Sequence, residues 1–391
     1  MAKLLERIET VFDENELIHI FKEIVKTPSE NPGDYEEAVA IKIQNILNEK
    51  GIPARLVYAD AKRPNVYAVL KGNDEGKTVL YNGHLDVVPA RGDGWTHHPF
   101  SAFEDEDGYI YGRGAADMKS GVAAMLYAAI CLKRLGYPKK GTLRLFFNAD
   151  EERSNKGMKQ FLMEKWSADY AIISEPTSLH VAIGHRGAAR FILKTRGEAG
   201  HSCFVKNPNN AIEKMSRLLP YLFTYGERLR KMRVHDFLGS AISNVNTIRG
   251  GTVANIIPDE CVVEIDRRVL PSENIEDVTK EYIEVLDHAA KEEGVEYEFY
   301  NYAFLGASFI DKEHPLVKIT KEIADKYKTT KITSFEATCE APFFSVEKNI
   351  PTIIFGPGSL AEAHVVNEKV HKSEVIIAAK IFAELALKLS T

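Results

Sequence analysis

The apolar side chains recur at different spacings along the chain, and these spacings predict alternating helices and strands. Residues 3–26 and 35–50 place apolar side chains three and four positions apart, which predicts a helix in each segment. Gly51 follows the second segment in the position of a C-terminal cap. Shorter apolar runs predict strands at 54–58, 65–70, 79–81, 141–148 and 171–173, and a longer one predicts a helix at 121–135. This alternation indicates an α/β domain.

From about Gly187 the order of the predicted elements changes. The segments are a strand at 188–195, a helix at 211–230, strands at 242–248 and 261–269, a helix at 275–292 and a strand at 295–300. The order strand-helix-strand-strand-helix-strand fits a ferredoxin-like domain inserted into the first domain.

The α/β pattern resumes after about Leu305, with a helix at 315–327, a strand at 350–355 and a helix at 375–389. We therefore predict a discontinuous main domain, residues 1–185 and 302–391, and an inserted domain at residues 186–301. Two domains also fit the length, because 391 residues exceed what one core ordinarily holds.

Composition narrows the class of protein. Hydrophobic residues make up 45% and charged residues 27%, as in soluble globular proteins. The net charge of −6 gives no electrostatic reason to expect nucleic acid or an anionic membrane as a partner. We see no apolar signal core near Met1, and the longest apolar run, 122–132, is too short to span a bilayer. The scattered cysteines predict packing thiols in a reducing cytoplasm: Cys131, Cys203, Cys261 and Cys339.

Candidate chemistry begins at the end of the strand 79–81, where His84 and Asp86 stand two residues apart. On an extended chain both side chains point to the same face. This suits a metal-bound histidine whose other ring nitrogen is held by a carboxylate. It equally suits a buried, hydrogen-bonded histidine, which is the commoner case for an isolated His-x-Asp. His97 and His98 lie in a polar loop and are left out of the site.

Asp117 precedes the apolar helix 121–135 and follows a glycine-rich stretch. The glycines do not match a nucleotide-binding loop, because Asp117 occupies the position of a required glycine and Met118 precedes Lys119. A carboxylate near a helix N-terminus stays ionised. Asp117 is therefore either a helix cap or a metal ligand.

Further acids and a histidine stand where other predicted strands end. Asp150, Glu151 and Glu152 follow one strand, Glu175 follows the next, and His364 follows the strand 350–355 by one loop. In an α/β sheet the carboxyl edge is where the chemistry lies. The acidic run Asp150–Glu152 could contain a general base next to a metal ligand, or it could be an ordinary acidic turn. The repetition indicates one crevice.

Taken together, these residues resemble the M20 metallopeptidase family, which includes zinc-dependent aminoacylases, deacetylases, desuccinylases and carboxypeptidases. The resemblance runs over nearly the whole chain, and the conjunction of motifs is specific although each is weak. The matching segments are Gly83–Pro89, Gly112–Lys119, Asp150–Glu152, Ser174–Pro176, His364 with Asn367 and Glu368, and, in the inserted domain, Gly200–Ser202, Asn210–Ile212 and Asn255–Pro258.

The resemblance implies a zinc-exopeptidase-like α/β/α catalytic domain with an inserted ferredoxin-like lid that dimerises. It implies that one metal ion is held by His84, Asp117 and Glu175. A second is held by Asp117, Glu152 and His364, so that Asp117 bridges the two. The ions are expected to be two Zn²⁺, with Co²⁺ or Mn²⁺ as alternatives.

The resemblance also assigns the remaining roles. Asp86 orients His84, Glu151 is the general acid/base, and the peptide between Asp117 and Met118 is cis. His201 donates to the oxyanion from the partner subunit of a homodimer. The candidates for gripping the substrate are Arg186, Asn255, Arg268 and Thr338.

The resemblance implies hydrolysis of the amide bond of N-acyl amino acids, with a dipeptidase or carboxypeptidase as the alternative. The segment Gly112–Lys119 is most similar to desuccinylases and deacetylases, but two departures weaken a succinyl specificity. Cys339–Pro342 replaces a motif that ends in arginine, and Leu360 stands where desuccinylases tend to carry asparagine. A metal-stabilised binding protein without activity is disfavoured, because Glu151 and every expected ligand are present.

Overall fold

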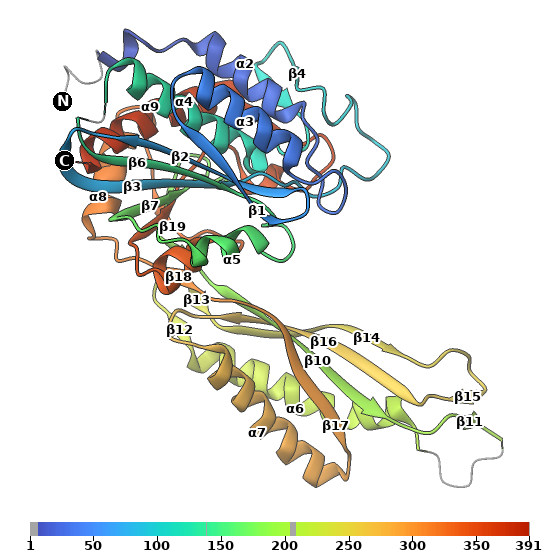
Figure 1. Cartoon of the computed structure of the whole chain (residues 1–391). Coiled ribbons are helices and arrows are strands. Elements are labelled where there is room, and N and C mark those ends of the chain that lie inside the picture. The colour runs from blue at the N-terminus through green and yellow to red at the C-terminus, as the bar shows by residue number, and fades with distance from the viewer. Residues whose placement is uncertain (1–6, 138, 204–208, 391) are drawn as a thin grey trace. The chain divides into compact units, whose positions relative to one another are not determined.

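The structure is a computed structural model that describes residues 7–137, 139–203 and 209–390. The chain forms two compact units (Figure 1). Unit 1 contains residues 1–184, 309–335 and 339–391, and unit 2 contains residues 185–308 and 336–338.

Unit 1 is built on an eight-stranded sheet with the order β1-β2-β6-β3-β7-β20-β8-β19. Four adjacent strands of this sheet, β6, β3, β7 and β20, run parallel to one another. Their carboxyl ends therefore meet at one edge of the sheet. The other strands complete both sides of the sheet. The bounds of all eight strands, in sheet order, are Ala54–Asp60, Arg63–Lys71, Lys140–Asn148, Asp74–His84, Tyr170–Ile173, Thr352–Ile354, Val181–Ala182 and Ile332–Thr333.

Helices cover both faces of this sheet, with α2, α3, α4 and α9 on one face and α5 on the other (Figure 1). The core helix is α4, in which every residue from Ser120 to Leu132 is buried. It packs against α9, which is also mostly buried. The bounds are α2 Glu14–Val25, α3 Glu37–Glu49, α4 Ser120–Arg134, α5 Lys156–Met163, α8 Pro315–Ala324 and α9 Lys372–Leu389. Segment Ala115–Arg134 is apolar and long enough to cross a membrane, but its apolar window is entirely buried within the protein.

The prediction of one helix over residues 3–26 is wrong. Residues 1–6 lie outside the described part, and helix α2 begins only at Glu14. The side chain of Asp13 accepts hydrogen bonds from the backbone N–H groups of Asn15 and Glu16, at 2.9 and 3.2 Å. This is an N-cap, which starts a new helix although the apolar spacing continues across it.

The short helix η1, Ala115–Lys119, connects a loop to α4 and contains a cis peptide bond between Asp117 and Met118. The resemblance to the M20 family predicted this bond, and the prediction is confirmed. A second cis bond joins Asn31 to Pro32. Near η1, a small three-stranded sheet is formed by β4 Phe103–Glu104, β5 Tyr109–Tyr111 and β21 Lys369–His371.

Unit 2 contains an antiparallel sheet with the order β14-β16-β10-β17, and helices α6 and α7 cover one of its faces (Figure 1). In chain order the elements are β10 Gly187–Arg196, α6 Ala211–Met232, β14 Ile242–Gly250, β16 Glu260–Val269, α7 Ile275–Glu293 and β17 Tyr297–Leu305. This is the predicted ferredoxin-like order of strands and helices. The alternating burial along β10 and β16 explains why the pattern was readable in the sequence.

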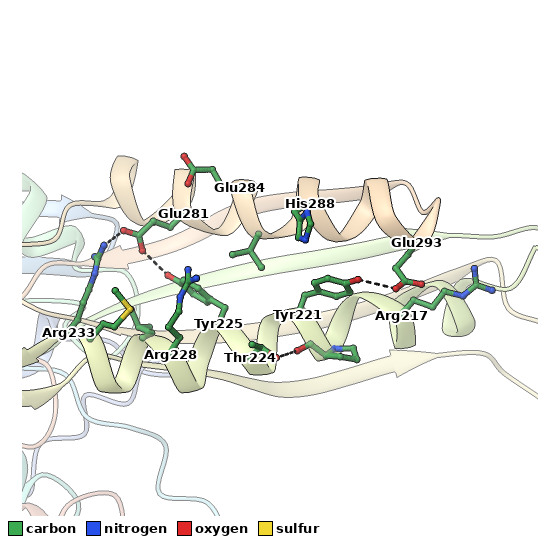
Figure 2. A pocket seen from close by; sticks show the side chains of 14 residues that line it. Arg217, Tyr221, Thr224, Tyr225, Arg228, Arg233, Glu281, Glu284, His288 and Glu293 are labelled. Atoms are coloured by element: carbon green, nitrogen blue, oxygen red, sulfur yellow. Dashed lines mark hydrogen bonds and ion pairs between the residues drawn. The ribbon is translucent and has the colours of Figure 1, made fainter.

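A groove of about 1050 Å³ lies between α6 and α7 (Figure 2). Two tyrosines of α6 cross its floor and donate hydrogen bonds to acids of α7. Tyr221 donates to Glu293 at 3.1 Å, and Tyr225 donates to Glu281 at 2.8 Å. These contacts hold the two helices together along the groove.

Candidate metal centre

The carboxyl edge of the unit 1 sheet positions most of the predicted ligands. His84 is the last residue of β3, and it lies beside Asn148, the last residue of β6. The loop after β6 carries Glu151 and Glu152, and Glu175 stands two residues beyond β7. Because β3, β6 and β7 are parallel neighbours, these loops leave the sheet side by side.

Two groups of potential ligands share one carboxylate. The first consists of His84, Asp117 and Glu175, and the second of Asp117, Glu152 and His364. The Nε2 atom of His84 lies 3.0 Å from Oδ1 of Asp117 and 3.8 Å from Oε1 of Glu175. The Nε2 atom of His364 lies 3.3 Å from the other oxygen, Oδ2, of Asp117 and 3.0 Å from Oε1 of Glu152.

The two oxygens of Asp117 therefore face two different histidines, as a carboxylate that bridges two metal ions would. The donor atoms in each group lie within 4.8 Å of one another. Two imidazole nitrogens with carboxylate oxygens suit zinc, and also cobalt or manganese. The residues present thus fit the pair of ions that the sequence predicted.

Burial and crowding shift the pKa values of the acids in this cluster. Burial raises the pKa of Glu151 well above its usual range, and the nearby Glu340 adds to the effect. Burial likewise raises the pKa of Glu175, and the charge of Asp117 contributes. Burial alone would raise the pKa of Asp117 too, but hydrogen bonds from His364 and His84 outweigh it and lower that pKa.

The pKa values of the two histidines are also raised, but here the cause is attraction to the neighbouring carboxylates. Hydrogen bonds to Asp117 and Glu152 raise the pKa of His364 to about 10. Burial opposes protonation of His84, yet Asp117 and Glu175 outweigh it and raise its pKa well above the usual range. The protein groups alone therefore favour positive charge at this position. A bound dication would supply that charge and release the histidine protons.

Asp86 contacts both His84 and the loop after β6 that carries Glu151 and Glu152, which we call the acidic loop. The Nδ1 atom of His84 lies 2.8 Å from the backbone carbonyl oxygen of Asp86 and 3.7 Å from its carboxylate. The carboxylate instead accepts hydrogen bonds from the backbone N–H groups of Glu151 and Glu152, at 3.0 and 3.1 Å. Asp86 thus orients the histidine mainly through its main chain, while its side chain fixes the loop that carries the two glutamates.

The sequence did not predict which residues hold Asp117. Glu368 is buried and accepts hydrogen bonds from the backbone N–H groups of Ala116 and Asp117, at 2.9 and 3.0 Å. Arg113 forms an ion pair with Glu368 at 2.6 Å. Both residues lie in segments that match the family, but those segments did not show that the two residues hold the backbone of Asp117.

Glu340 is a third residue whose place the sequence did not predict. It is fully buried, and its Oε1 atom accepts a hydrogen bond from the side chain of Asn148 at 2.8 Å. Its Oε2 atom has no hydrogen-bond partner among the described residues. It forms a carboxylate cluster with Glu151 and Glu175.

The other five predicted site residues belong to unit 2, and four of them form two pairs. His201 lies opposite Ile256, and the N–H of Ser202 donates to the carbonyl of Asn255, so His201 and Asn255 are neighbours. Arg186 precedes β10, whose Ala188 pairs with Arg268. Thr338 lies in the short segment 336–338.

The two pairs lie at opposite ends of β10. Arg186 and Arg268 are at its start, and His201 and Asn255 lie beyond its end. A strand of ten residues spans about 30 Å. Within one copy of unit 2, the two pairs are therefore far apart.

Comparison with known proteins identifies the family. The model of peptidase family M20/M25/M40 matches residues 80–388. The chain belongs to this family. The M20 resemblance in the sequence is thereby confirmed, as is the expectation of a metal-dependent hydrolase.

Three bacterial proteins are similar to this chain. A Staphylococcus epidermidis protein named "Probable succinyl-diaminopimelate desuccinylase" is 27% identical, over 93% of this chain and 95% of its own length. Aminopeptidase PepT from Bacillus cereus is 21% identical with a TM-score of 0.80, covering 97% of this chain and 100% of that one. The Bacillus subtilis YXEP protein, described as a dinuclear metal-binding peptidase of the M20 family, is 19% identical with a TM-score of 0.71, covering 96% and 98%.

The ligand groups predict how metal ions affect stability. Adding Zn²⁺ to protein stripped with a chelator is expected to raise its melting temperature, because an ion at a thousand times its Kd adds about 4 kcal/mol to the free energy of unfolding. His364→Ala is expected to bind one fewer ion per chain and to show a smaller rise. Metal analysis and thermal unfolding measure both quantities. His97→Ala, a histidine outside both ligand groups, serves as the control, and an equal loss in this variant would contradict the assignment.

Proposed function

We propose that the protein is a dinuclear zinc amidohydrolase that cleaves the amide bond of N-acyl amino acids. One observation carries the proposal: Asp117 directs its two oxygens at two histidines, each part of a separate ligand group. His84, Asp117 and Glu175 hold one ion, and Asp117, Glu152 and His364 hold the other. When bound, two such ions lower the pKa of a shared water and polarise the carbonyl of the substrate.

Glu151 acts as the general acid/base in this proposal. It lies among the ligand groups, next to Glu152 in sequence, while it belongs to neither of the two groups that share Asp117. It takes the proton of the attacking water and returns it to the leaving nitrogen.

His201 donates a hydrogen bond to the developing oxyanion, a contribution worth about 3 kcal/mol in comparable sites. Arg186, Asn255, Arg268 and Thr338 bind the substrate carboxylate and the adjoining amide. Cationic and amide side chains suit such groups, because both donate hydrogen bonds to carboxylate or carbonyl oxygens.

We further infer a homodimer that forms through unit 2, with His201 acting in trans. The distance between the two residue pairs supports this inference. An N-acyl amino acid is far shorter than the about 30 Å strand between them. One copy of unit 2 therefore cannot bring Arg186 and His201 to the same substrate. In a symmetric dimer, Arg186 and Arg268 serve their own chain's site, while His201 and Asn255 serve the partner's.

We also propose an acyl group and a location. The similarity to a protein named as a desuccinylase favours an N-acyl amino acid, whereas Cys339–Pro342 and Leu360 depart from the desuccinylase pattern. The fold similarity to PepT, which is named an aminopeptidase, favours cleavage of peptides, so a dipeptidase or carboxypeptidase stays the alternative. The cysteines are all free, which agrees with a cytoplasmic enzyme.

A substrate panel separates the two activities. The zinc-loaded enzyme is expected to hydrolyse N-acetylornithine or N-succinyl-diaminopimelate with a kcat/KM at least about tenfold above that for simple dipeptides, a difference of about 1.4 kcal/mol in transition-state binding. Release of the free amino group measures the rate. Faster cleavage of dipeptides would favour the peptidase alternative, and hydrolysis of none of these substrates would contradict both.

Replacing the general base separates chemistry from metal binding. Glu151→Gln is expected to lower kcat by a factor of about 100 or more, because general acid–base catalysis typically contributes that much. The variant should keep its metal content and its unfolding temperature. Kinetics, metal analysis and thermal unfolding test the three expectations. A variant that retains nearly full turnover would remove Glu151 from this role.

Mixing two inactive variants tests the dimer. His201→Ala and Glu151→Gln are each expected to be inactive, and exchange of subunits should restore activity. At random exchange about half the dimers are hybrids with one intact site each, so about a quarter of wild-type activity should return. Mass spectrometry of labelled subunits provides the control for exchange. Proven exchange without recovered activity would mean that His201 acts in its own chain or not at all.

A further inference from the structure

We propose that Arg63 is the positioning residue for the loop that carries Glu151 and Glu152. The inference rests on the proposed function, since it explains how this chain aims its general base and one metal ligand. Arg63 is the first residue of β2 and is almost completely buried. It lies in neither ligand group, and no motif in the sequence singled it out.

The guanidinium group of Arg63 binds three side chains from different parts of unit 1. Its Nη1 atom donates to Oδ1 of Asp150 at 2.6 Å and to Oε1 of Glu36 at 3.1 Å. Its Nη2 atom donates to Oδ1 of Asn31 at 2.9 Å. The ring of Tyr35 stacks over the group at 4.1 Å, which closes one of its faces. These contacts leave the guanidinium a single orientation.

Asn31 and Asp86 connect Arg63 by hydrogen bonds to the acidic loop, which carries Glu151 and Glu152. The Nδ2 atom of Asn31 donates to Oδ2 of Asp86 at 2.8 Å and to Oδ1 of Asp150 at 2.9 Å. The two oxygens of Asp86 then accept the backbone N–H groups of Glu151 and Glu152. Arg63 and Asn31 therefore fix the carboxylate of Asp86, which accepts the backbone N–H groups of Glu151 and Glu152.

Asp150 forms a second and more direct connection. It begins the acidic loop in a left-handed conformation, with φ of 66°, which residues other than glycine rarely adopt. Its Oδ2 atom accepts the backbone N–H of Lys156 at 3.2 Å, and its own N–H donates to Glu36 at 3.1 Å. The ion pair with Arg63 holds the side chain of Asp150 in place and so supports this sharp turn directly before Glu151.

Charge explains why an arginine is required here. Glu36, Asp86 and Asp150 are all buried, and Arg63 is the cation that lies within hydrogen-bond distance of this group in the described part of unit 1. Without it, Asp150 would lose the ion pair that balances its charge. Glu36, whose pKa burial already raises to about 8, would lose the positive charge that opposes that rise. Lysine would keep the charge, but its single ammonium group cannot reproduce a planar fork that reaches three acceptors at once.

The central experiment compares Arg63→Lys with Arg55→Lys in the zinc-loaded enzyme. Arg55 lies on the neighbouring strand β1, where its exposed side chain pairs with Glu164, so it is a matched control. Arg63→Lys is expected to lower kcat about 10- to 100-fold while KM changes little, the usual cost of losing a group that orients metal ligands. Arg55→Lys should behave as the wild type.

Metal binding gives a readout that does not depend on activity. Arg63→Lys should weaken the ion held by Glu152 and His364 by about tenfold or more and leave the other ion's affinity nearly unchanged. Titration of chelator-stripped protein with Zn²⁺ measures both affinities. A lower melting temperature with wild-type kcat and wild-type metal affinities would show a purely structural role and overturn the proposal.

A second variant covers the case in which Arg63→Lys does not fold. Asn31→Ala leaves the contacts of Arg63 with Glu36 and Asp150 in place. It removes the amide that accepts from Arg63 and donates to Asp86 and Asp150. It should lower kcat in the same direction, and unchanged kcat and metal affinity would overturn the proposal. If the wild type hydrolyses no substrate while Arg63→Lys loses affinity for one ion, the proposed function fails and the positioning role stands.

Discussion

Repulsion among buried carboxylates is the constraint on which the arrangement of unit 1 depends. Asp117, Glu175 and Glu340 are buried at the carboxyl edge of the sheet, and the half-buried Glu151 lies beside them. Ionised groups at such distances need either protons or nearby positive charge. Two histidines meet part of that need, and a pair of metal ions would meet the remainder. The fold can therefore hold this cluster of carboxylates because the same residues would bind cations.

Around this cluster, carboxylates serve a second purpose by accepting backbone N–H groups. Asp86 holds the amides of Glu151 and Glu152, and Glu368 holds those of Ala116 and Asp117. Ligands on loops are normally mobile, but amides fixed by buried acids cannot shift without breaking charge-assisted hydrogen bonds. The precision of the centre thus comes from residues behind it as much as from the donor atoms themselves.

Much of the fold could be predicted because it has a regular period. The elements of unit 2 alternate in burial with a strand or helix repeat, and the position of His84, Glu151 and Glu175 after apolar runs indicated a shared edge. The break at Asp13 was missed because the apolar spacing continues through it. Arg63 and Asn31 were missed for a different reason: their partners lie far away in sequence, so no local pattern records the contact.

The burial of α4 has a consequence for how the chain is made. This helix is apolar on all sides, and its main helical neighbour is α9, the last described helix of the chain. During synthesis, residues of the whole of unit 2 emerge from the ribosome before α9 does. The nascent protein must therefore expose or temporarily shield the surface of α4 that α9 later covers. A truncated chain that lacks residues 372–389 would keep that surface open and would be a natural target for chaperones and proteases.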